Sequence, residues 1–195
     1  MKLFRPNYSS QTDEQLMTAM SKGDKMAFDE LYKRFAGQLR GYFQKMLWQD
    51  KEKAEDFVHD LFAKLIRNPD YFDVNRSFKT WLFSVASNMC KNEYKKQEVR
   101  KNTSNGIEEY RSVSSTNDVV SEVQDAQFKQ AFEKCLSELD EKHREVFTLR
   151  HFDGLSMKEI SEVMDINEGT VKSRLFYATK QLSEQLKAFN PVLNY

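Results

Sequence analysis

The side chains with the clearest chemical potential lie near the C-terminal end of the chain, in a segment that begins with Glu168-Gly169-Thr170. If this segment is helical, one of its faces carries hydroxyl and cationic groups, namely Thr170, Lys172, Ser173, Arg174 and Tyr177. Such a face can donate hydrogen bonds to base edges and phosphates in the major groove of DNA. A solvated helical hairpin shows the same kind of outer face. Both interpretations stay open on these residues alone.

Two helices separated by a tight turn are needed to present this face. Ile160, Val163 and Met164 recur at helical spacing, and the pattern then breaks at residues 165–167. A second helical period follows, with apolar positions at Val171, Leu175, Ala178 and Leu182. The stretch 155–182 therefore predicts a helix, a turn and a second helix.

A strongly amphipathic helix is predicted over residues 54–66. Its apolar face is formed by Ala54, Phe57, Val58, Leu61, Phe62 and Leu65. The opposite face carries Glu52, Glu55, Asp56, His59 and Asp60. DNA would repel this acidic surface, whereas a basic protein surface could bind it. Simple solvation is the alternative.

Positive charge gathers further along the N-terminal half. Between residues 76 and 101 the cations are Arg76, Lys79, Lys91, Lys95, Lys96, Arg100 and Lys101, and the anions are Glu93 and Glu98. Aromatic and amide side chains lie among these cations and in the preceding loop. Cations can hold phosphates while aromatic and amide groups accept an unstacked base, so this segment suits melted DNA. A solvated basic helix is again the alternative.

Composition favours an all-α protein without chemistry of its own. The chain has 195 residues, with 30 Lys and Arg balancing 30 Asp and Glu, so a nucleic-acid surface requires local segregation of charge. Only six Gly and three Pro occur, which favours helices with short connections. Cys90 and Cys135 lack the spacing of a disulfide framework or a zinc site. No catalytic motif appears, so we expect no enzyme, cofactor or metal.

The order of these patterns predicts two small helical domains. Residues 1–10 read as a flexible arm, residues 11–101 as the first domain, residues 102–126 as a flexible acidic linker and residues 127–190 as the second domain. The linker carries Glu108, Glu109, Asp118, Glu122 and Asp125 against Arg111. No signal peptide and no apolar stretch of about 20 residues is seen, so we expect a cytoplasmic protein without membrane insertion.

Four motifs resemble the extracytoplasmic-function (ECF) group of the bacterial sigma-70 family. AEDFVHDLFAKLI is similar to sigma region 2.2, and SFKTWLFSVASNMCKNEYKK is similar to regions 2.3 and 2.4. LSELDEKHREVFTLRHFDGLS resembles region 4.1, and LSMKEISEVMDINEGTVKSRLFYATKQL resembles the helix-turn-helix of region 4. The resemblance implies that the first domain is region 2 and the second is region 4.

The resemblance also assigns roles to individual residues. Core RNA polymerase would be contacted on the clamp coiled coil of its largest subunit by Asp56, His59 and Asp60, with the flap region as a further contact. The −10 element would be bound by Phe72, Arg76, Lys79, Asn88, Asn92 and Lys95, with Phe72 and Asn88 forming a pocket for the flipped base. The −35 element would be bound by Arg150, Asn167, Gly169, Thr170, Lys172, Ser173, Arg174, Phe176 and Tyr177.

Five positions depart from the family pattern. His59 stands where Gln is usual, Glu93 replaces an aromatic residue, and Ser84 replaces a basic residue. Lys172 and Tyr177 stand where many relatives carry arginine. Lysine cannot form the bidentate fork of arginine on guanine, so we predict reduced or altered −35 discrimination.

The leading hypothesis is a sigma factor that binds core RNA polymerase and directs initiation by −35 recognition and −10 recognition and melting. An anti-sigma factor or another regulator would be a further partner. Two alternatives remain: an adaptor that recruits polymerase together with another DNA-targeting factor, and a stand-alone helix-turn-helix regulator.

Overall fold

The computed structural model describes residues 7–103 and 120–187, and it confirms an all-α fold. Over these residues the chain forms α-helices and two short 3-10 helices, and no strand occurs in the part of the chain so described. None of the described helices combines the length and the apolar character needed to cross a bilayer.

The N-terminal half contains α1 (Asp13–Ser21), α2 (Lys25–Met46), α3 (Lys51–Arg67) and α4 (Phe78–Thr103), with short helices η1 (Tyr8–Ser10) and η2 (Pro69–Tyr71). Side chains at the helix starts define these bounds. Thr12 and Gln15 form a capping box on α1, and Asp24 and Asp50 accept backbone N–H bonds at the starts of α2 and α3. These caps satisfy amide groups that have no intrahelical partner.

The C-terminal half contains α5 (Val120–Glu138), α6 (Glu141–His151), α7 (Met157–Met164) and α8 (Glu168–Gln185). Asp140 caps α6, and Ser156 forms a capping box with Glu159 on α7. A small core of Leu136, Leu139, Phe147, Ala178 and Leu182 joins α5, α6 and α8.

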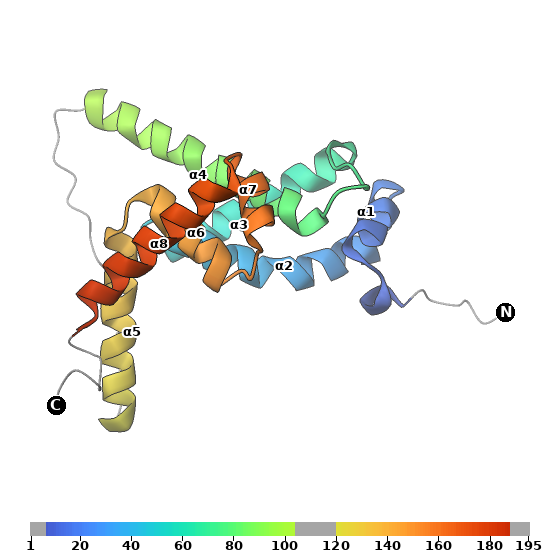
Figure 1. The fold of residues 1–195 in the computed structure, drawn as a ribbon. Helices are drawn as coiled ribbons and strands as arrows, with labels where there is room; N and C mark the ends of the chain where they lie inside the picture. Colours follow the sequence, from blue (N-terminus) through green and yellow to red (C-terminus); the bar gives the residue numbers. More distant parts are fainter. Residues whose placement is uncertain (1–6, 104–119, 188–195) are drawn as a thin grey trace.

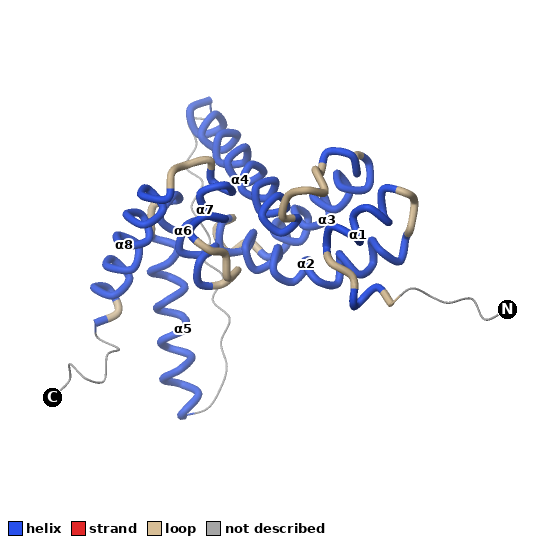
Figure 2. Tube along the Cα trace, turned by 45° about the vertical axis from the view of Figure 1, so that its right-hand side comes forward, coloured by secondary structure: helices blue, strands red, loops and turns tan. Residues whose placement is uncertain are grey.

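The two halves share the main hydrophobic core. Buried residues of α2 and α4 belong to the same cluster as buried residues of α6, α7 and the first turn of α8. Figures 1 and 2 both show α7 lying against α4 and α6 lying beside α2, which agrees with the contacts between these helices. The described chain therefore adopts a closed arrangement, by which we mean that the C-terminal half packs directly on the N-terminal half.

Polar contacts complete this closed arrangement. The Tyr42 hydroxyl donates a 3.0 Å hydrogen bond to the buried carboxylate of Glu145. The Lys45 ammonium lies 4.2 Å from the centroid of the Phe152 ring. Lys79 donates to the backbone carbonyl of Asp153. Each contact joins α2 or α4 to α6 or to the loop that follows α6.

Three local features differ from the sequence expectation. Tyr8–Ser10 is a short helix rather than a loose arm, because Arg34 binds its backbone carbonyls. α4 and α5 enter the expected linker from its two sides, and the remaining residues 104–119 lie outside the described residues. A charged residue in an amphipathic helix is expected on the outside, but Arg144 in α6 is buried and donates to the Ser137 carbonyl at 2.9 Å.

Candidate nucleic-acid interface

Helix α8 presents a continuous exposed face, as its periodicity predicted. Val171, Ala178 and Leu182 are buried and fix the helix on α6 and α7. The exposed members of the candidate −35 set on this helix are Gly169, Lys172, Ser173, Phe176 and Tyr177, while Thr170 and Arg174 are half-buried. Phe176 and Tyr177 are 64% and 58% exposed, and their rings meet edge to face at 5.5 Å. Exposed aromatic rings next to cations and hydroxyls leave a surface that can approach base edges.

The turn before α8 is built by residues that also belong to the candidate −35 set. Asp165 ends α7 in the left-handed conformation with φ 55°. Asn167 caps α8, since its Oδ1 accepts from the Thr170 amide at 2.8 Å. A Cβ at Gly169 would lie 3.2 Å from that same oxygen, so glycine keeps the cap uncrowded. Asn167 and Gly169 therefore shape the start of the helix in this structure.

Arg150 lies at the end of α6 and remains exposed. One of its guanidinium nitrogens donates to the Leu155 carbonyl at 2.9 Å. This bond ties α6 to the segment that enters α7 and leaves the rest of the guanidinium open to a phosphate.

The candidate −10 residues fall into two groups on α4. Asn88, Asn92 and Lys95 are exposed and follow one another at helical spacing, so they form one stripe. Lys79 precedes Asn88 by about two and a half helical turns and points to the other side of the helix. There it is half-buried beneath the C-terminal half, bonded to the Asp153 carbonyl. The structure thus separates Lys79 from the stripe Asn88, Asn92 and Lys95.

The loop before α4 holds the remaining −10 candidates. Phe72 is only 5% exposed, and its ring packs 5.3 Å from Phe78 and 5.4 Å from Trp81. Its neighbour Tyr71 is 76% exposed, and Arg76 also faces solvent. Phe72 therefore supports the loop from beneath.

The candidate polymerase-binding residues lie together on the outer face of α3. Asp56, His59 and Asp60 are all exposed and lie within about one helical turn of one another. Nε2 of His59 lies 3.6 Å from Glu55, whose carboxylate also pairs with Arg40 on α2. The face is therefore acidic, and the pair Arg40–Glu55 holds it to α2. Asp56, His59 and Asp60 themselves are left exposed by the described residues.

Glu93 has a structural role that the sequence did not reveal. It is buried, and its carboxylate accepts from the Lys53 ammonium at 2.6 Å. Burial alone would raise the pKa of Glu93, but hydrogen bonding and attraction by Lys53 lower it below the ordinary value. An ion pair between α3 and α4 thus occupies the position where the family carries an aromatic ring.

Sequence reasoning also missed the buried acids of the closed arrangement. Asp153 is buried against the N-terminal half, and burial raises the pKa of its carboxyl to about 7 although Lys45 and Lys79 act in the opposite direction. Burial likewise raises the pKa of Tyr42 well above its ordinary value, with the charge of Glu145 contributing. The burial of Asp153 and Glu145 has no signal in the sequence, because Asp153 lies in a turn-forming stretch and Glu145 lies in an ordinary amphipathic helix.

Comparison with known proteins agrees with this geometry. A model of Sigma-70 region 2 matches residues 31–100, and a model of Sigma-70, region 4 matches residues 129–182. RNA polymerase sigma-H factor of Pseudomonas aeruginosa is 28% identical over 192 residues, covering 95% of this chain and 97% of its own. ECF RNA polymerase sigma-E factor of Escherichia coli K12 is 28% identical over 184 residues, covering 90% and 95%.

Solved structures show the same fold. The sigma factor RpoE of Bartonella quintana, in complex with the anti-sigma factor NepR, is 26% identical with a TM-score of 0.66, covering 82% of this chain and 96% of that chain. CnrH, in complex with the cytosolic domain of CnrY, has a TM-score of 0.70 at 24% identity and covers 91% of this chain and 99% of that chain.

The chain belongs to the sigma-70 family, whose members are transcription initiation factors. Within that family it is a sigma factor of the ECF group, a protein that binds core RNA polymerase and promoter DNA and directs initiation at promoters. The resemblance drawn from the four sequence motifs is confirmed.

Proposed function

We propose that the α8 face reads the −35 element and that the exposed stripe of α4, with the loop before it, binds the melted −10 element. The single observation that carries this proposal is the exposed face of α8, where Lys172, Phe176 and Tyr177 face solvent although the helix is firmly anchored beneath. Arg150 and Arg174 lie beside this face and are suited to phosphate contacts. Asn167, Gly169, Thr170 and Ser173 complete the set.

We further propose that Lys79 joins the −10 contacts only after the two halves separate. In the closed arrangement its ammonium is bonded to the Asp153 carbonyl beneath the C-terminal half. Asn88, Asn92 and Lys95 need no such movement, since they already face solvent. Opening would therefore add Lys79 to a surface that is already partly available.

The acidic face of α3 is proposed to bind the clamp coiled coil of the largest polymerase subunit. Asp56, His59 and Asp60 are exposed and complementary in charge to a basic surface. The flap region is the proposed contact of the C-terminal half. Since the polymerase carries the catalytic chemistry, we propose no enzymatic step for this chain. Because bacterial polymerase works on cytoplasmic DNA, we assign the protein to that compartment.

An anti-sigma protein is a further proposed partner. The solved complex of RpoE with NepR supports it, because that relative shares 26% identity and the fold over 82% of this chain. Such a partner would have to act on the closed arrangement or on the surfaces that opening exposes.

The test is run-off transcription with core polymerase from the same organism, freed of other sigma factors, on a library of randomised promoters. We expect initiation only when the chain is added, at sites that share −35 and −10 sequences. The variant Asp56→Arg should lose core binding and initiation, while Asp29→Arg, which reverses another exposed charge on α2, should retain both. Core binding without independent initiation would instead favour a polymerase adaptor, and duplex binding without polymerase would favour a stand-alone regulator.

A further inference from the structure

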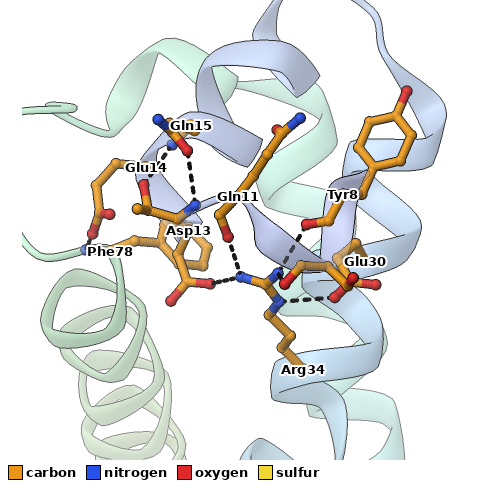
Figure 3. A network of polar contacts seen from close by, with 10 residues as sticks. Tyr8, Gln11, Asp13, Glu14, Gln15, Glu30, Arg34 and Phe78 are labelled. Carbon is orange, nitrogen blue, oxygen red and sulfur yellow. Dashed lines mark hydrogen bonds and ion pairs between the residues drawn. The ribbon is translucent and has the colours of Figure 1, made fainter. Parts of the chain in front are cut away.

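The N-terminal segment is clamped onto α2 by a single guanidinium group. Arg34 donates five hydrogen bonds, which Figure 3 shows gathered around its side chain. The acceptors are the Gln11 carbonyl at 2.9 Å, Asp13 at 2.8 Å, the Tyr8 carbonyl at 3.0 Å, the Ser9 carbonyl at 3.2 Å and Glu30 at 3.0 Å. A planar fork of donors with this many acceptors fixes both position and orientation. The start of α1 is thereby immobilised against α2.

The residue that follows this clamp reaches a different part of the fold. Oε1 of Glu14 accepts the backbone N–H of Phe78 at 3.0 Å, and Figure 3 shows its side chain directed away from Arg34 toward α4. Phe78 is the first residue of α4, so its amide has no partner within the helix. A carboxylate at this end also faces the positive pole of the helix dipole.

The charge state of Glu14 fits this role. Burial alone would raise the pKa of its carboxyl, but the backbone N–H of Phe78, the N–H of Glu14 itself and the Thr12 side chain outweigh burial and lower the pKa. Glu14 is therefore ionised at neutral pH and a strong acceptor for the Phe78 amide.

The bond from Glu14 fixes one end of the loop that carries the −10 candidates. The other end is held by Phe72, whose ring packs on the fully buried ring of Phe78. Between these two anchors, residues 73–77 are exposed. Asp73 folds them back on themselves, since its Oδ1 accepts from the Asn75 amide at 3.0 Å and its carbonyl accepts from the Arg76 amide at 2.9 Å. The loop is thus preformed at both ends and in its middle.

We propose that Glu14 is a positioning residue for promoter melting: it holds the start of α4 and the loop 73–77 in the geometry that captures the unpaired −10 strand, and Arg34 holds Glu14 in place. This inference rests on the proposed function of α4 and its loop. A preformed loop binds DNA without the entropic cost of ordering that a mobile loop would have. Glu14 touches no DNA in this scheme and acts through the Phe78 amide.

The experiment uses holoenzyme reconstituted from the full chain and core polymerase on a promoter selected with the wild-type protein. Open complex is followed by permanganate reactivity of −10 thymines and by fluorescence of 2-aminopurine placed in the −10 element. Glu14→Ala should lower the rate of open-complex formation about tenfold, the scale of one lost charge-assisted hydrogen bond. Glu14→Gln retains an acceptor oxygen and should restore the rate to within about threefold of wild type. Asp29→Ala, an exposed acid on α2 outside this network, is the control.

Two further measurements separate positioning from general damage. Affinity for core polymerase and for duplex −35 DNA should stay unchanged in Glu14→Ala, because α3 and α8 carry those contacts. Glu14→Asp keeps the charge but shortens the side chain, so it should open promoters at an intermediate rate, and it replaces Glu14→Ala in the comparison if that variant does not fold.

The outcomes distinguish a positioning role of Glu14 from a purely structural one. Normal promoter opening by Glu14→Ala overturns the inference, and so does an equal loss of core binding, −35 binding and opening, which would show a purely structural role. If wild-type holoenzyme itself opens no promoter, the proposed function fails and the inference fails with it. Slow opening in Glu14→Ala, recovery in Glu14→Gln and unchanged binding support the inference.

Discussion

The two surfaces proposed to read promoter DNA differ in how far the closed arrangement leaves them free. The face of α8 is open, with Phe176 and Tyr177 more than half exposed. On α4, by contrast, α7 covers one side of the helix, and Lys79 is bonded to Asp153. The proposed −35 surface is thus free in the closed arrangement, whereas the proposed −10 surface would be complete only after opening. We therefore expect −35 binding to precede full engagement of the −10 strand.

The largest effect on the closed arrangement is expected from damage to the core that the two halves share. Ile160 on α7 is fully buried in that core, and Ile160→Ala should lower the free energy of unfolding by about 2–5 kcal/mol. Both tryptophans, Trp48 and Trp81, lie in the N-terminal half. If the halves unfold together, denaturation followed by tryptophan fluorescence should shift even though the substitution lies in the C-terminal half.

The matched control is Leu182→Ala, which removes a buried side chain from the small core of α5, α6 and α8. It should shift the tryptophan transition less, because Leu182 does not belong to the shared core. An unchanged tryptophan transition in Ile160→Ala, with a separate loss of helical circular dichroism, would mean that the two halves unfold independently.

A milder test removes one hydroxyl from the contact between the halves. Tyr42→Phe leaves the buried Glu145 carboxylate without its donor from α2, which should weaken the closed arrangement by about 1–3 kcal/mol. Small-angle X-ray scattering should show a larger radius of gyration, and single-stranded −10 DNA should bind more tightly. Tyr32→Phe removes another hydroxyl from α2 without touching Glu145 and should change neither quantity. Unchanged scattering in Tyr42→Phe would contradict the role of this hydrogen bond.

The closed arrangement should also respond to pH through Asp153. Burial raises the pKa of this carboxyl to about 7, against the opposing effect of Lys45 and Lys79, and exposure on opening would return it to about 4. The closed form therefore binds a proton that the open form lacks, and closing becomes more favourable as the pH falls below 7. Between pH 8 and pH 6 the equilibrium should move about tenfold toward the closed form.

Scattering across this pH range measures the effect, and Asp153→Asn is the control. Asparagine cannot ionise, so the variant should stay closed and show no such dependence. A pH response that persists unchanged in Asp153→Asn would assign it to another group.

The smallest effect is expected on the surface that is already open. Lys172→Ala on α8 should weaken binding to duplex −35 DNA a few-fold and reduce the dependence of the binding constant on salt by about one counterion. Lys187→Ala, an exposed lysine beyond the end of α8, should leave both unchanged. A loss confined to one DNA sequence, at unchanged salt dependence, would show that Lys172 reads a base and does not contact a phosphate.

Local features of the fold could be predicted from the sequence because they depend on neighbouring residues. The apolar spacing of Val171, Ala178 and Leu182 predicts the buried side of α8, and Thr12 and Asp140 are recognisable helix caps. The same spacing predicts the exposed face of α8 and the acidic face of α3. The assignment of these faces to promoter and polymerase stays a prediction.

Packing between distant helices could not be predicted in the same way. The periodicity of α4 shows that one side must be covered, but it does not show that α7 covers it. Arg144 illustrates this limit, since a charged side chain in an amphipathic helix is expected outside, yet here it is buried and bonded to the Ser137 carbonyl. Phe72 illustrates it again, because its burial depends on Phe78 and Trp81 beyond the loop. Its role in a base pocket stays a prediction.

The shared core has a consequence for the way this protein is made. A ribosome completes α4 well before it reaches α7, and at about 5–20 residues per second the interval is on the order of seconds. During that time the side of α4 that α7 later covers has no partner from its own chain. A nascent N-terminal half could therefore be captured by a chaperone, or by a polymerase molecule nearby, before the rest of the chain folds over it.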